Sequence, residues 1–63
     1  LLGLPLLFEA FGEGSEMIRR IPVASDRADG QIADLLKTAG VKFINVRNAE
    51  AGCFVCRIEP PEY

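Results

Sequence analysis

The chain has 63 residues and a net charge of −2, from nine acidic and seven basic side chains, and it contains no histidine. A chain this short forms one domain at most and buries only about 60% of the surface that it exposes when unfolded, so its stability is marginal. The apolar fraction of 49% is too high for a disordered chain. Phosphate recognition needs a clustered positive field, so this charge predicts no nucleic-acid partner.

The cysteine content and the lengths of the apolar runs bear on the compartment. Two cysteines are too few for a disulfide-rich secreted domain, and no basic signal peptide precedes an apolar run. No run reaches the ~18 apolar residues that span a bilayer. These features predict a cytoplasmic protein with free thiols and without a membrane span.

The first eleven residues are almost wholly apolar. Pro5 suits the first turn of a helix and Gly12 suits its C-terminal cap. The spacing i, i+3, i+4, i+7 then gives one apolar stripe, formed by Leu4, Leu7, Phe8 and Phe11. We expect a short helix over residues 1–11 and a flexible linker over 12–16. Met17 follows the linker, either as the start of the domain or as an ordinary core residue.

Residues 17–63 carry the pattern of a compact β-α-β-β domain. Strands are predicted over 17–23, 41–47 and 53–59 from β-branched and aromatic residues and from turn signals. A helix of about fourteen residues is expected between Ser25 and Gly40. Its buried stripe consists of Ala28, Ile32, Leu35, Leu36 and Ala39.

The fold class expected from this pattern is α+β. A right-handed crossover makes the first two strands parallel neighbours, and a short turn makes the last two an antiparallel hairpin. The result is a small three-stranded mixed sheet packed on one helix, preceded by the N-terminal helix. Alternation places Ile44, Val46, Phe54, Cys56 and Ile58 toward the helix and leaves Val41, Phe43, Cys53 and Val55 on the other face.

Cys53 and Cys56 have the C-x-x-C spacing of a dithiol redox centre or of half a zinc site. On a regular strand, side chains three apart point to opposite faces, which disfavours both uses. Core or surface thiols, a zinc ion shared between subunits and a redox dithiol remain alternatives.

No nucleophile with a base and an orienting group can be assembled from these residues, so we expect no enzymatic activity and no cofactor. One helix cannot cover both faces of a three-stranded sheet. The sequence therefore predicts a protein-interaction module, an accessory or regulatory subunit or a homo-oligomer, that binds a protein partner or itself. The expected binding residues are Leu4, Leu7, Phe8, Phe11, Val41, Phe43 and Val55.

Overall fold

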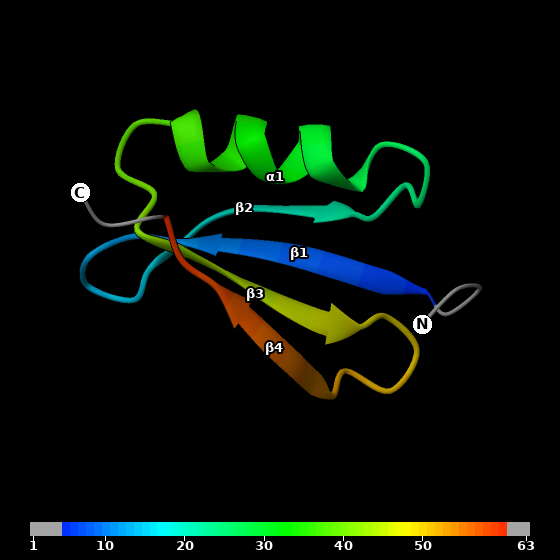
Figure 1. Ribbon diagram of the computed structural model, residues 1–63. Helices are drawn as coiled ribbons and strands as arrows, with labels where there is room; N and C mark the ends of the chain where they lie inside the picture. The colour runs from blue at the N-terminus through cyan, green and yellow to red at the C-terminus, as the bar shows by residue number, and fades with distance from the viewer. Residues whose placement is uncertain (1–4, 61–63) are drawn as a thin grey trace.

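The computed structural model describes residues 5–60, which form four strands and one helix (Figure 1). In chain order the elements are β1 Leu6–Phe11, β2 Met17–Pro22, α1 Ala28–Lys37, β3 Phe43–Asn48 and β4 Phe54–Ile58. The strands form a single sheet in the order β2-β1-β3-β4. Every neighbouring pair is antiparallel.

The expected three-stranded mixed sheet is therefore wrong. β2 and β3 both pair antiparallel with β1, so they run in the same direction, as a crossover through α1 requires. They are not neighbours, however, because β1 lies between them. The connection from β2 through α1 to β3 therefore passes over β1, which comes from the N-terminal segment. The sheet has four strands and is wholly antiparallel.

The expected N-terminal helix is also wrong in the described part of residues 1–11. Residues 6–11 form β1, and Leu4 lies outside the described residues. The almost wholly apolar segment fits both the helical repeat of 3.6 residues and the strand repeat of 2 residues. Residues 6–11 form a strand because they then make hydrogen bonds to a strand on each side. A helix this short would be only marginally stable on its own hydrogen bonds.

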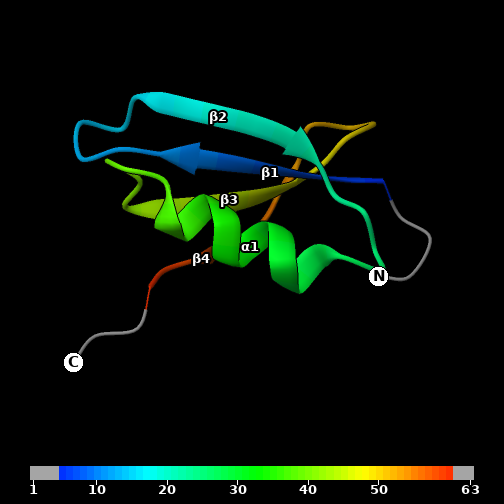
Figure 2. The same cartoon turned by 90° about the horizontal axis from the view of Figure 1, so that it is seen from above.

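Helix α1 lies across β1 and β3 and covers one face of the sheet (Figure 2). It is shorter than expected, begins after Arg27 without a side-chain cap, and ends before Thr38. The core lies between α1 and the sheet, and Ile44 at its centre is fully buried. The other buried apolar residues there are Phe8, Ala10, Leu35, Val41 and Val46.

Two register irregularities shift side chains between faces. Arg47 pairs with Phe54 whereas Val46 pairs with Cys56, so Val55 is an extra residue in β4. Phe54 therefore lies on the face of Arg47, away from α1, and the expectation that it faces the helix is wrong. A second shift, between Ala10 and Phe11, leaves an extra residue in β2.

Candidate functional site

The sheet face opposite α1 carries side chains in rows that cross the strands, and we call it the open face. The register defines a polar row through all four strands, consisting of Arg20, Glu9, Asn45 and Arg57. Each row contributes one side chain per strand because directly opposed residues point to the same side of a sheet. Arginines therefore stand at both outer ends of this row, with a glutamate and an asparagine between them.

Less polar rows flank the polar row on both sides. One consists of Pro22, Leu7, Arg47 and Phe54, and the other of Met17, Phe11 and Phe43. The rings of Phe11 and Phe43 are stacked, with centroids 5.4 Å apart and planes at 17°. Phe54 is 52% exposed and Met17 is 47% exposed. The open face thus presents apolar surface on either side of a charged centre.

The guanidinium of Arg47 is held from three sides. Its Nε donates to Oε1 of Glu9 at 2.7 Å, and its Nη1 donates to the backbone carbonyl of Gly52 at 3.1 Å. The Cζ atom lies 5.9 Å from the ring centroid of Phe54. A guanidinium fixed in this way loses little further conformational entropy when it binds a ligand.

Arg57 is held in a related way on the neighbouring strand. Its Nε donates to Oδ1 of Asn45 at 3.3 Å, and its Cζ lies 4.1 Å from the ring centroid of Phe43. Asn45 is buried, whereas Arg57 is exposed. The cation–π contact orients the guanidinium over the ring and keeps it at the surface.

The open face is electropositive within an acidic chain. Among the described residues that pair within the sheet, Arg20, Arg47 and Arg57 stand against one carboxylate on this face, that of Glu9, a local charge of +2, while the whole chain carries −2. Glu9 is already engaged by Arg47, so Arg20 and Arg57 supply the charge that an incoming group would meet. Guanidinium groups bind carboxylates in bidentate geometry.

The structure brings together some of the side chains expected to bind a partner and separates others. Leu7, Phe11 and Phe43 lie on the open face, and Val55 is exposed at the irregularity in β4. Phe8 and Val41 are buried in the core under α1. Leu4 lies outside the described residues.

Sequence reasoning missed the three arginines of the open face. In the sequence, Arg20 stands out only as one of three nearby arginines, with Arg19 and Arg27. The available signal was strand alternation, because Arg19 and Arg20 are neighbours in β2 and must point to opposite faces. Recognising β1 as the central strand was necessary to align Arg20 with Arg57.

Cys53 and Cys56 are both exposed and unbonded. The extra residue between them changes the alternation on which their expected divergence rested. Among residues 5–60, no group of three or more histidine, cysteine, aspartate or glutamate side chains is placed to hold a metal ion. In the same range, no helix has the length and apolar character needed to cross a membrane.

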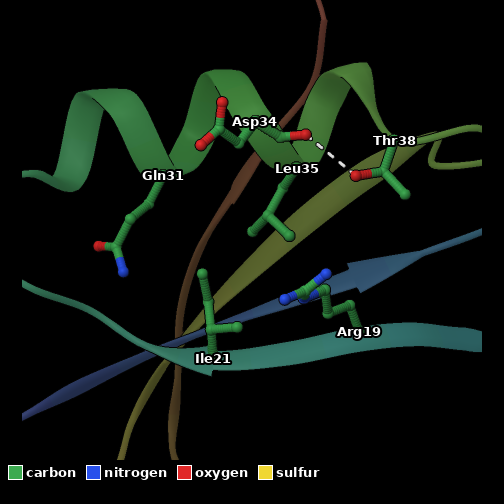
Figure 3. A pocket seen from close by; sticks show the side chains of 6 residues that line it. All are labelled: Arg19, Ile21, Gln31, Asp34, Leu35 and Thr38. Carbon is green, nitrogen blue, oxygen red and sulfur yellow. Dashed lines mark hydrogen bonds between the residues drawn. The ribbon is translucent and has the colours of Figure 1, made fainter.

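A cleft lies on the other side of the sheet, between β2 and α1 (Figure 3). This cleft of about 190 Å³ is lined by Arg19, Ile21, Gln31, Asp34, Leu35 and Thr38. Ile21 and Leu35 point toward one another at its floor. Thr38 Oγ1 donates to the backbone carbonyl of Asp34 at 3.0 Å, so its proton is already bound to the end of the helix.

The side chain of Gln31 lines this cleft and stabilises the segment that links β2 to α1. Its Oε1 accepts from the Ala24 amide at 2.8 Å, and its Nε2 donates to the Pro22 carbonyl at 3.0 Å. Both ends of the amide are therefore occupied by the segment that links β2 to α1. The open face offers more uncommitted polar and apolar groups than the cleft, and we take it as the candidate site.

Comparison with protein families gives a match over most of the chain. The model of the family DUF1203, described as a protein of unknown function, matches residues 1–60. A search of curated proteins and a search of solved structures each found no match. Because the match covers nearly the whole sequence, the chain belongs to the DUF1203 family.

Proposed function

We propose that this chain is a non-catalytic protein-interaction module that binds an acidic segment of a partner protein on its open face. It acts without a cofactor, as an accessory or regulatory subunit, in a reducing compartment such as the cytoplasm. The observation that carries the proposal is the polar row, in which Arg20 and Arg57 flank buried Glu9 and Asn45.

Charge complementarity selects the partner. The open face is positive while the chain as a whole is negative, so a carboxylate-bearing segment is attracted to this face more than to the rest of the surface. Carboxylates of such a segment meet Arg20 on β2 and Arg57 on β4, the two ends of the row. We do not expect nucleic acid to compete well, because two free arginines release few counterions.

The flanking rows supply the apolar part of the interface. Phe54 and Met17 each expose about half of their surface, and covering a large apolar side chain contributes roughly 1.5–3 kcal/mol when burial is complete. Phe11 and Phe43 already stack on one another, so they form a preordered platform. An acidic segment that also carries apolar residues is therefore the partner that this face fits best.

The test is a titration of the isotope-labelled chain with two polyanions, followed by backbone NMR. One is a peptide of alternating glutamate and leucine, and the other is an oligouridylate of similar charge. We expect the peptide to shift the resonances of the open face, including Asn45, and to shift them less as salt is raised. A stronger response to the oligouridylate would contradict a protein partner.

Neighbouring arginines in β2 offer a matched control. Arg20→Gln and Arg19→Gln change the net charge equally, but Arg20 lies on the open face and Arg19 lines the cleft beside α1. We expect Arg20→Gln to weaken peptide binding several-fold and Arg19→Gln to leave it nearly unchanged. Equal losses would mean that only the total charge matters, and the proposed site would be wrong.

A further inference from the structure

We propose that Cys53 and Cys56 form a two-thiolate site for a soft monovalent cation of the copper(I) class. The site lies at the outer edge of β4, on the side of the sheet that α1 covers. It goes beyond the proposed function and does not depend on it, because the open face is the opposite side of the same sheet. The register of β4, the spacing of the two cysteines and their exposure carry the proposal.

Cys56 stands on the α1 side of the sheet. It pairs with Val46, and Val46 is buried in the core under α1. Directly opposed residues point to the same side of a sheet, so Cys56 points to the side of α1 as well. It is nevertheless exposed, because α1 lies over β1 and β3 while β4 is the strand at the margin (Figure 1).

Cys53 stands on the same side, opposite the next row of the sheet. The residue that follows it, Phe54, pairs with Arg47. The Asn48 N–H donates to the Cys53 carbonyl at 2.8 Å, so the ladder continues by one step and sets these two residues opposite one another. Asn48 pairs on its other side with Leu6, which packs against the core under α1. The extra residue in β4 therefore turns to one face two side chains that regular alternation would separate.

The separation of the two cysteines suits a bridging ion better than a disulfide. They lie opposite positions two apart in β3, so their Cα atoms are roughly 6.6 Å apart at about 3.3 Å per residue. Side chains stand nearly perpendicular to a sheet, so the Cβ atoms are about as far apart, whereas a disulfide needs Cβ atoms about 3.5–4.5 Å apart. Two metal–sulfur bonds of about 2.3 Å span up to about 4.6 Å between the sulfurs. An ion held by both thiolates therefore requires less movement of the strand than a disulfide.

The number and kind of donor atoms select the ion. Thiolates are soft ligands that favour copper(I), whereas magnesium and calcium prefer oxygen ligands. Zinc takes four ligands in a structural site, and no third or fourth ligand is placed beside these cysteines among residues 5–60. Copper(I) is stable between two thiolates alone. Binding releases the two thiol protons to solvent, transfers no electron, and leaves a complex with one negative charge.

The first test is a titration of the full chain with copper(I), kept reduced by ascorbate in the absence of oxygen, in competition with the chelator bicinchoninate. We expect one ion per chain. Cys53→Ser and Cys56→Ser should each weaken binding at least about 100-fold, because a single thiolate then holds the ion. One ion shared by two chains in native mass spectrometry, or a single-cysteine variant that binds as tightly as the wild type, would overturn the proposal.

A matched control keeps two cysteines but places them on opposite faces. Cys53→Ser combined with Phe54→Cys sets the thiols at positions 54 and 56, and position 54 lies on the open face opposite Arg47. These thiols are nearer in sequence than those of the wild type, yet we expect copper(I) to bind as weakly as in the single-cysteine variants. Binding as tight as in the wild type would show that any two nearby thiols suffice, and the proposed geometry would be wrong.

Deletion of Val55 tests the register irregularity itself. Without the extra residue, Cys53 and Cys56 stay opposite the same two residues of β3 and become next-but-one neighbours on a regular strand, which share a face. We therefore expect the affinity for copper(I) to change less than about tenfold. A gain of about 100-fold would mean that the two thiols diverge in the wild-type chain and that the site does not exist there. This comparison decides alone if the variant with cysteines at 54 and 56 fails to fold.

Discussion

Glu9 and Arg47 form an ion pair on the sheet face that no described helix covers, with Nε and Oε1 2.7 Å apart. They stand diagonally across β1 and β3, because Asn45 is directly opposite Glu9. The Glu9 side chain is only 8% exposed, whereas that of Arg47 is 34% exposed. The arginine therefore acts as the cover that keeps a carboxylate buried in the central strand.

The energetic role of this pair can be measured by a double-mutant cycle. Arg47→Leu leaves the buried carboxylate without its partner, and we expect a loss of about 2 kcal/mol in the free energy of unfolding. Glu9→Leu together with Arg47→Leu should cost less than Arg47→Leu alone, because no charge is then left buried. Urea denaturation gives the free energy of unfolding of the wild type, of both single variants and of the double variant. Additive effects of the two substitutions would show that Glu9 and Arg47 do not stabilise one another.

A chain that begins at Met17 should not fold. It lacks β1, which pairs with both β2 and β3 and contributes Phe8 and Ala10 to the core. Without it, β2 has no neighbour in the sheet, and the core under α1 loses two of its six buried apolar residues. We expect a circular dichroism spectrum of an unfolded chain and no cooperative thermal transition. A cooperative transition of the shortened chain would show that β1 is dispensable.

Two glycines near α1 should respond in opposite directions to the same substitution. Gly30 lies within the helix, and a Cβ there meets nothing within 4 Å, so Gly30→Ala should stabilise the chain by about 0.5–1 kcal/mol. Gly40 has φ +87°, a conformation that alanine rarely adopts, so Gly40→Ala should destabilise by about 1 kcal/mol. Thermal melts of both variants check the signs, and a gain in both would show that the backbone at Gly40 rearranges.

From β2 onward, the elements could be predicted from local signals. Strand alternation, Pro22 at a strand end and the turn ending at Gly52 place β2, β3 and β4 within two residues of their observed bounds. The stripe containing Ile32 and Leu35 places α1, although the helix begins at Ala28 and ends at Lys37, inside the expected bounds.

The N-terminal segment could not be assigned by the same means. Leu7, Phe8 and Phe11 suit a helical stripe, yet in β1 Phe8 turns to the core while Leu7 and Phe11 turn to the open face. The choice depends on hydrogen bonds to β2 and β3, and β3 lies more than thirty residues away in the chain. The candidate site had to be missed as well, because its polar row exists only once β1 separates β2 from β3.

The segment that links β2 to α1 is held in place by two hydrogen bonds of the Gln31 side chain. Its amide satisfies the Ala24 N–H and the Pro22 carbonyl, two backbone groups that no strand or helix ladder pairs. Gln31→Ala removes both hydrogen bonds, and we expect a loss of about 1–2 kcal/mol, reduced by a few tenths because alanine favours the helix. Gln31→Glu keeps the acceptor for Ala24 but sets a carboxylate oxygen against the Pro22 carbonyl in place of the donor, so its loss should be at least as large.

Amide exchange separates this role from a general loss of stability. In Gln31→Ala the Ala24 amide should exchange faster than the change in global stability requires, while amides of β3 should follow the global change. Lys37→Ala, an exposed change in the last turn of the same helix, serves as the control and should leave the Ala24 amide protected. If the Ala24 amide keeps its protection in Gln31→Ala, the side chain does not hold the link, and the end of β2 is fixed by its pairing with β1 alone.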